Sequence, residues 1–175
     1  MKLREEISVV LPAYNAGPFI KDSLLSLKNQ SLAPKEIILV NDGSTDNTVQ
    51  IASSLKLDNL KIISFESNKG IVHALNEGIK VTQGNYIARM DADDISLPQR
   101  FEKQLEFLKS YQLDLCSSWV LNKRNNTETI FRFPKASELY TMLPLVSTIA
   151  HAAVMAKIAF FNDNLYNTEY EMIKD

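Results

Sequence analysis

The sequence predicts an α/β fold in which parallel strands form an open sheet with helices on both faces. Four short runs rich in β-branched residues recur along the 175-residue chain, and their starts lie about 24 to 30 residues apart. The runs are almost continuously apolar, which is typical of parallel strands covered on both faces. The segments between them carry apolar residues at helical spacing, so right-handed strand–helix–strand crossovers are expected.

Each predicted element rests on its own run of residues. The four strands are expected at Ile7–Leu11, Ile37–Val40, Ile62–Phe65 and Tyr86–Met90. The first three helices are marked by the apolar sets Ile20, Leu24, Leu27, then Ile51, Ala52, Leu55, then Val72, Leu75, Ile79. A fourth helix is expected to start near Ser96, where Ser96, Pro98 and Gln99 fit a capping pattern.

The last third of the chain follows a different pattern. Two strands at 114–121 and 129–133 are expected around a polar turn, followed by a helix from about Ala136 and a strand at His151–Met155. The apolar stretch 142–161 has the length of a membrane span. It also holds several polar residues that are costly in a bilayer, so a buried strand and helix are expected instead.

No linker or repeat divides the chain, so we expect one domain over residues 1–175. Its polar end, residues 166–175, lacks a closing element, and this predicts a domain truncated at the C-terminus. Lys plus Arg is 19 and Asp plus Glu is 21, and without a basic tract a nucleic-acid partner is not expected. The single cysteine, Cys116, excludes a disulfide framework and favours a cytoplasmic location.

Polar residues follow all four predicted strands, where an open parallel sheet binds its ligands. Pro12–Asn15 follow the first strand, Asn41–Ser44 the second, Glu66–Gly70 the third and Asp91–Asp94 the fourth. Ordinary turns and helix caps, with Ser44 or Thr45 as a cap, explain each loop singly. They do not explain Asp91 and Asp93 together, because neighbouring carboxylates repel each other unless a cation lies between them.

Missing motifs narrow the class of ligand. The five glycines give neither a dinucleotide-binding fingerprint nor a P-loop, and a serine nucleophile elbow is also absent. Carboxylate ligands without cysteine or clustered histidine suit Mg²⁺ or Mn²⁺, which commonly bridge to substrate phosphates. The sequence therefore predicts a nucleoside diphosphate held with a divalent metal.

Two segments resemble the family 2 glycosyltransferases. Residues 7–48 read ISVVLPAYNAGPFIKDSLLSLKNQSLAPKEIILVNDGSTDNT, similar to the start of their catalytic domain. Residues 68–104 read NKGIVHALNEGIKVTQGNYIARMDADDISLPQRFEKQ, similar to their donor region with its DxD motif. The resemblance implies the GT-A fold, a Rossmann-like open mixed sheet with helices on both faces. It also implies a nucleotide-sugar donor, most often a UDP-sugar.

The resemblance also assigns roles to residues of the donor site. Asp42 is expected to bind the nucleobase, Tyr14 to lie against it, and Pro12 to shape the loop. Asp91 is expected to contact the ribose, and Asp93 to hold Mn²⁺ or Mg²⁺ on the diphosphate. Two cationic residues each have two interpretations. Lys69 is either a phosphate contact or a solvated loop residue, and Arg89 is either a phosphate contact or part of a structural ion pair.

On the acceptor side, the family carries a Glu-Asp pair whose aspartate is the catalytic base. Asp175 matches that aspartate, although Lys174 stands in place of the glutamate, and Glu169 and Glu171 are the alternatives. His151 is expected near the acceptor or as a satisfied core histidine. This 175-residue form is expected to bind donor but to transfer poorly.

The implied activity is a metal-dependent transfer with inversion, in surface polysaccharide synthesis. The acceptor would be a saccharide or a lipid-linked sugar, with peripheral association at the inner face of the membrane as an option. Two other classes stay open. One is a nucleotide-sugar-binding module without turnover, and the other is a nucleotidyltransferase, for which Asn15–Pro18 is a poor triphosphate loop.

Overall fold

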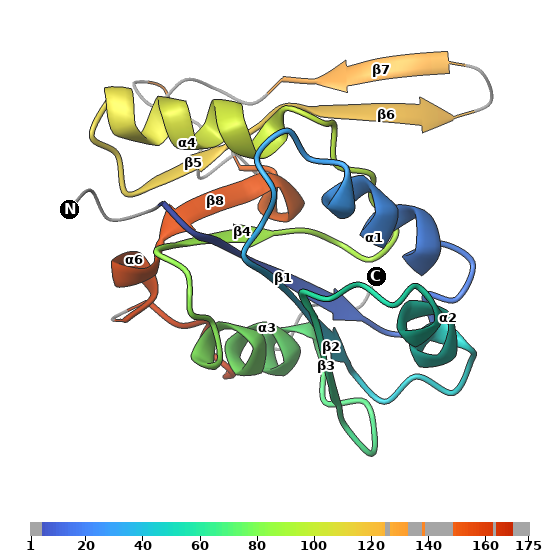
Figure 1. The fold of residues 1–175 in the computed structure, drawn as a ribbon. Coiled ribbons are helices and arrows are strands. Elements are labelled where there is room, and N and C mark those ends of the chain that lie inside the picture. Colours follow the sequence, from blue (N-terminus) through green and yellow to red (C-terminus); the bar gives the residue numbers. More distant parts are fainter. Residues whose placement is uncertain (1–4, 125–126, 133–137, 139–148, 163, 170–175) are drawn as a thin grey trace.

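The chain folds around one six-stranded mixed sheet (Figure 1). The computed structural model describes residues 5–124, 127–132, 138, 149–162 and 164–169. The strands lie in the order β3-β2-β1-β4-β8-β5. Their bounds are β1 Ile7–Ala13, β2 Glu36–Asn41, β3 Leu60–Ser64, β4 Tyr86–Arg89, β5 Leu115–Ser117 and β8 Val154–Lys157. The first four strands are parallel, and β8 runs antiparallel to both β4 and β5.

The predicted parallel strands are confirmed, and their burial explains their apolar runs. Every residue of β1, β2 and β4 is buried, because these strands lie inside the sheet with helices on both faces. β3 lies at an edge and is only partly buried. The central strand β1 pairs with β2 from Ser8 opposite Glu36 to Ala13 opposite Asn41. All four strands therefore end at one edge of the sheet.

Helices cover both faces of this sheet (Figure 1). Their bounds are α1 Ile20–Lys28, α2 Thr48–Ser54, α3 Ile71–Lys80, α4 Arg100–Ser110 and α6 Ile158–Asn162. The larger core cluster joins one face of β1, through Val9 and Leu11, to α1, α2 and α4. On the opposite face Val10 packs with Leu75 of α3 and Phe161 of α6. The residues picked out by helical spacing belong to these two clusters, except Val72, in whose place Ile71 packs.

The expected strand 114–121 is in fact two strands in different sheets. β5 pairs with β8 over three residues, whereas β6 Val120–Arg124 pairs with β7 Thr127–Phe131 in a separate two-stranded sheet. The break has a simple cause. β8 is four residues long, so the partner of β5 ends at Val154, opposite Ser117. Beyond that point the chain turns away and forms the β6–β7 hairpin, drawn at the upper right of Figure 1.

Two other boundaries differ from the sequence prediction. The expected strand at His151–Met155 begins later: 151–153 form the 3₁₀ turn η2 and β8 starts at Val154. Helix α4 begins at Arg100, and Gln99 makes no side-chain capping bond. Ser96 belongs to the preceding loop, where its N–H donates to Ser26 Oγ at 2.9 Å. The expected helix from Ala136 lies outside the described residues.

Residues 149–161 form η2, β8 and the start of α6, in line with the expected buried strand and helix. In the described part of the chain, no helix has both the length and the apolar character needed to cross a membrane.

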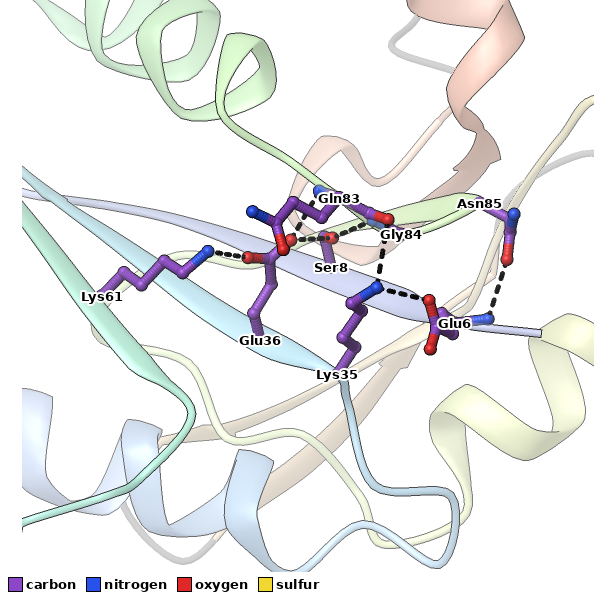
Figure 2. Close-up of polar contacts among 8 residues, drawn as sticks. All are labelled: Glu6, Ser8, Lys35, Glu36, Lys61, Gln83, Gly84 and Asn85. Atoms are coloured by element: carbon purple, nitrogen blue, oxygen red, sulfur yellow. Dashed lines mark hydrogen bonds and ion pairs between the residues drawn. The ribbon is translucent and has the colours of Figure 1, made fainter. Parts of the chain in front are cut away.

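A polar network ties the sheet together at the edge opposite the strand ends (Figure 2). The buried carboxylate of Glu36 accepts hydrogen bonds from Ser8 Oγ, Lys61 Nζ and the Gln83 N–H, each at 2.6 Å. Ser8 Oγ in turn accepts from the Gly84 N–H at 2.9 Å. These bonds join the starts of β1, β2 and β3 to the loop before β4, and so set the register that aligns the functional edge.

Candidate functional site

A pocket opens where β1 and β4 end. Its volume is about 210 Å³, and it is lined by 12–16, Phe19 and 91–93. The sequence-predicted residues Pro12, Tyr14, Asp91 and Asp93 therefore meet in one place, although about 80 residues separate the two loops. They meet because β1 and β4 are parallel neighbours, so their carboxyl ends lie side by side.

The loop after β1 is held by the loop after β2. Asn15 has a positive φ of 49°; its N–H donates to Ser44 Oγ at 2.9 Å, and its Oδ1 accepts the Thr45 N–H at 2.9 Å. The expected capping role of Ser44 or Thr45 is therefore wrong. The N-cap of α2 is Asn47, which makes no side-chain capping bond, and Asp46 just before it accepts the Thr48 N–H at 3.0 Å.

Asp46 and Thr48 extend this connection into the first turn of α2. The Gly17 N–H donates to Asp46 Oδ2 at 2.9 Å, and the Ala16 N–H donates to Thr48 Oγ1 at 2.8 Å. Hydrogen bonds from the Thr48 hydroxyl and from backbone N–H groups hold the pKa of Asp46 below its ordinary value. The backbone beneath Tyr14 is therefore fixed by hydrogen bonds, whereas the Tyr14 side chain remains 51% exposed.

Asp42 is buried, and both of its carboxylate oxygens hold the loop after β3. Oδ1 accepts the Lys69 N–H at 2.7 Å, and Oδ2 accepts the Gly70 N–H at 2.9 Å. Gly43 allows this close approach, because a Cβ there would lie 2.4 Å from the Ser67 carbonyl carbon and its φ is +71°. Asp42 does not line the described pocket, and its carboxylate orders the neighbouring loop.

The side chain of Lys69 lies over Phe65, with Nζ 5.0 Å from the ring centroid. Lys69 is therefore an exposed loop residue, which is one of the two interpretations given for it from the sequence. Lys69 is not among the pocket-lining residues, and it acts on the site through its backbone N–H to Asp42.

Arg89 forms an ion pair with Asp91. Nη2 lies 2.6 Å from Oδ1, with the Arg89 side chain 5% exposed and that of Asp91 36% exposed. The Arg89 Nε is buried and has no hydrogen-bond partner in the described part of the chain. Asp93, in contrast, is exposed, and its carboxylate forms no ion pair or hydrogen bond with any described residue. Asp91 is therefore held in an ion pair, whereas the carboxylate of Asp93 is available to bind a ligand.

Asp94 and Arg100 are two further charged residues close to this pair. Burial raises the pKa of Asp94, and the nearby Asp91 and Asp93 carboxylates raise it further. Arg100, which the sequence prediction missed, donates from Nη2 to the carbonyls of Arg89 at 2.7 Å and Val154 at 3.3 Å. Burial lowers its pKa to about 10, so it stays a cation at neutral pH. No local pattern marks it, since an arginine in the first turn of a helix is common.

His151 and Tyr166 form a hydrogen-bonded pair. His151 Nε2 and the Tyr166 hydroxyl are 2.7 Å apart, and their rings meet edge to face at 5.2 Å. Burial lowers the pKa of His151, and the Arg89 cation lowers it further. The imidazole is bonded to Tyr166, so its hydrogen bond is satisfied, but His151 is exposed and the expectation of a core histidine is wrong.

Asn76 is a second residue that the sequence prediction missed. It is buried in α3 and holds the backbone of Tyr166 through two hydrogen bonds. An asparagine on the apolar face of an amphipathic helix was the available signal.

A divalent metal fits this pocket only with help from its ligand. The described residues contain no group of three His, Cys, Asp or Glu side chains able to hold a metal ion. The available carboxylate of Asp93, with Asp91 and Asp94 adding negative charge, suits a hard cation that takes its remaining ligands from a diphosphate and water. Of the candidate bases, Glu169 is described and exposed. Glu171 and Asp175 lie outside the described residues.

Comparison with known proteins gives one family. The sequence model described as Glycosyl transferase family 2 matches residues 8–166. An uncharacterized glycosyltransferase of Haemophilus influenzae is 45% identical over 105 residues, covering 59% of this chain and 32% of that protein.

Solved structures share the fold. The crystal structure of S. aureus TarS 1–349 in complex with UDP has a TM-score of 0.72 and 25% identity, covering 91% of this chain and 48% of that one. The mannosyltransferase PcManGT from Pyrobaculum calidifontis, in complex with GDP-Man and Mn²⁺, has a TM-score of 0.69 and 20% identity, covering 92% and 47%. The chain thus spans less than half the length of each.

Proposed function

Because this chain belongs to glycosyl transferase family 2 and has the GT-A fold, we propose that it transfers a sugar from a nucleotide-sugar to an acceptor. The observation that carries this proposal is the pocket between the β1 and β4 loops. One wall presents the exposed ring of Tyr14, and the other presents Asp91 and the available carboxylate of Asp93. An aromatic surface beside a negative rim suits a base and a metal-bound diphosphate.

The donor we propose is a UDP-sugar. The similarity to TarS, whose crystal structure holds UDP, supports this choice. Tyr14 would lie against the uracil, with Pro12 shaping the floor beneath it. Asp42 would help to bind the nucleobase in one of two ways. Its carboxylate would accept a hydrogen bond from the base directly, or it would act through the 66–70 loop that it holds. Asp91, kept in place by Arg89, would accept a hydrogen bond from the ribose.

Mn²⁺ or Mg²⁺ is the proposed cofactor, held by Asp93 with the donor diphosphate. When bound, the ion would neutralise the charge that develops on the departing UDP. The protein residues do the remaining work. Asp93 would supply the carboxylate that holds the ion, and Arg100 fixes the backbone of β4, from which Asp91 and Asp93 follow.

The proposed transfer is a single displacement with inversion at the anomeric carbon. Asp175 is the proposed base, which takes the proton of the acceptor hydroxyl as that oxygen attacks and the bond to UDP breaks. Glu171 and Glu169 are the alternative candidates for this base. A carboxylate near its reference pKa is a weak base, so the rate depends on holding the acceptor in line.

The acceptor we propose is a saccharide or a lipid-linked sugar, in the synthesis of a surface polysaccharide. A cytoplasmic site of action, with peripheral association at the inner face of the membrane, goes with that proposal. His151 would lie on the acceptor side of the pocket.

Thermal unfolding with UDP, with and without Mn²⁺ or Mg²⁺, tests the donor site. Ligand at about a hundred times its dissociation constant adds about 2.7 kcal/mol to the free energy of unfolding. We expect UDP to raise Tm, and metal to increase that rise. No shift with any nucleoside diphosphate at millimolar concentration would contradict the proposal.

Turnover then separates the classes of protein. Release of UDP from UDP-glucose, UDP-galactose or UDP-GlcNAc indicates a transferase, with water as the substitute acceptor. Binding without release indicates a binding module. Release of pyrophosphate from UTP and a sugar phosphate indicates a nucleotidyltransferase.

A further inference from the structure

One buried side chain of α3 holds a single residue near the end of the described chain. Asn76 Nδ2 donates to the Tyr166 carbonyl at 2.8 Å, and the Tyr166 N–H donates to Asn76 Oδ1 at 3.0 Å. Both ends of the amide are thus used by one backbone unit, 90 positions away in sequence. Two hydrogen bonds from one amide fix the position and the direction of that backbone.

Tyr166 carries this connection to the donor pocket. Its hydroxyl lies 2.7 Å from His151 Nε2, and its ring packs near Phe161 with centroids 6.5 Å apart. His151 lies in η2, directly before β8, and β8 pairs with β4. The buried Arg89 of β4 is close enough to both His151 and Tyr166 to affect their pKa values, and it holds Asp91 of the pocket. Hydrogen bonds therefore join Asn76 to Tyr166 and Tyr166 to His151, and the pairing of β8 with β4 places this end of the chain next to the strand that carries Arg89.

We propose that Asn76 is a positioning residue that anchors the chain at Tyr166 beside the Arg89–Asp91 end of the donor pocket. This inference rests on the proposed function, because its consequence concerns sugar transfer. The residues that follow Tyr166 include every candidate base, Glu169, Glu171 and Asp175. Fixing the backbone at Tyr166 sets the point from which that segment begins, and catalysis is sensitive to displacements of about 1 Å.

The composition around Asn76 supports a role beyond packing. Ala74, Leu75 and Ile79 of the same helix are buried apolar residues, and an apolar side chain at 76 would continue that face. A buried amide is costly unless its partners are in place. Both hydrogen-bond partners of the Asn76 amide are main-chain atoms of Tyr166. The amide therefore fixes the position of that backbone and does not depend on which side chain residue 166 carries.

Three variants separate the parts of this anchor. Asn76→Ala removes both backbone bonds, and Tyr166→Phe removes only the bond to His151. Asn59→Ala is the matched control, because Asn59 Nδ2 also donates to a backbone carbonyl, that of Pro34 at 3.0 Å, at the opposite edge of the sheet. The readouts are the hydrogen-exchange rate of the Tyr166 amide, the affinity for UDP with Mn²⁺, and the rate of UDP release from the UDP-sugar that the wild type hydrolyses fastest.

For Asn76→Ala we expect the Tyr166 amide to exchange at least about tenfold faster, because its acceptor is lost. UDP affinity should stay within about twofold of wild type, and kcat for UDP release should fall about tenfold or more at unchanged donor KM. Tyr166→Phe should keep the slow exchange and show a smaller loss of kcat. Asn59→Ala should change none of the three, apart from overall stability.

Unchanged exchange at Tyr166 in Asn76→Ala overturns the anchor. Faster exchange with the same kcat as Asn59→Ala overturns the positioning role. A wild type that does not bind UDP with either metal contradicts the proposed function itself, and the exchange result then still decides whether Asn76 anchors Tyr166. If the wild type binds UDP but releases none from the three UDP-sugars, both the proposed sugar transfer and the role of Asn76 in it are wrong.

Discussion

Arg89 and Asp91 are joined by an ion pair of 2.6 Å, and this pair gives the two aspartates of the pocket different states. Arg89 is buried on β4 and keeps Asp91 fixed, whereas Asp93 is exposed and its carboxylate has no partner among the described residues. The two side chains differ by only two positions in sequence. Their variants should therefore behave differently in binding and in stability.

Asp93→Asn should abolish the metal-dependent part of the UDP-induced rise in Tm. Because Asp91 and Asp94 lie close by, removing one negative charge relieves repulsion, so the stability of the free protein should stay unchanged or rise slightly. Thermal unfolding with UDP, measured with and without Mn²⁺, checks both parts. A variant that keeps the metal dependence of the parent would remove Asp93 from the metal site.

Asp91→Asn should instead destabilise the free protein. It removes the charged partner of a buried guanidinium whose Nε already has no partner, and a hydrogen bond to a charged group contributes about 1.5–3 kcal/mol. We expect a loss below this range, about 1 kcal/mol, because Asp91 is 36% exposed. Urea unfolding of the Asp91 and Asp93 variants side by side measures this difference. Equal stability of the two would show that the ion pair contributes nothing.

Asp42→Asn should weaken UDP binding with and without metal, and it should also lower stability. The amide can accept only one of the two N–H groups that the carboxylate accepts, and its own NH₂ would face the other. A loss of about 1–2 kcal/mol is expected for the unmatched N–H. Calorimetry of UDP binding with excess EDTA and then with Mn²⁺ measures the affinities. Binding lost only in the presence of metal would place Asp42 with the diphosphate.

Tyr14→Ala should weaken UDP binding while leaving the fold intact. Its side chain is 51% exposed, and the backbone beneath it is held by Ser44 and Thr45, so little packing is lost. Stacking of a base on an aromatic ring contributes about 1–3 kcal/mol, which corresponds to at least about fivefold in affinity. Tyr111→Ala is the matched control, since Tyr111 is exposed and lies outside the pocket. Equal affinities for UDP in the two variants would contradict the stacking role.

Glu36 should contribute stability that depends on pH. Burial by itself would raise its pKa, but hydrogen bonds from Lys61, Ser8 and Gln83 outweigh that effect and hold the pKa below the ordinary value of 4.5 (Figure 2). The contribution is therefore fully present above pH 4.5 and is lost as the pH falls through the lower folded value.

Glu36→Gln should cost about 1–3 kcal/mol at pH 7, and the difference from wild type should shrink in acid. Urea unfolding at pH 7 and at several values below pH 4.5 measures it. Glu77→Gln is the control, because the exposed Glu77–Lys80 pair contributes little. A Glu36→Gln penalty that stays constant down to the acid limit would contradict this account.

Local pattern was enough to predict the parallel half of the sheet and the edge that carries the pocket. Val9, Ile38 and Ala88 lie in runs that are buried on both faces, and burial on both faces produces the continuous apolar signal. Because β1 and β4 are parallel, Tyr14 and Asp93 were expected at the same edge, and the pocket contains both. The acidic pair was visible for a similarly local reason, since two carboxylates two positions apart need an explanation.

Tertiary structure alone decided where the later strands go and what each polar side chain binds. The antiparallel insertion of β8 between β4 and β5 depends on pairing between distant segments, so a local pattern contains no trace of it. The same holds for the bonds of Asp42 to the 66–70 loop, of Arg89 to Asp91, and of Asn76 to Tyr166. Hydrophobic periodicity fixes which face of an element is buried, whereas hydrogen bonds and ion pairs form only between groups that the completed fold brings within about 3 Å.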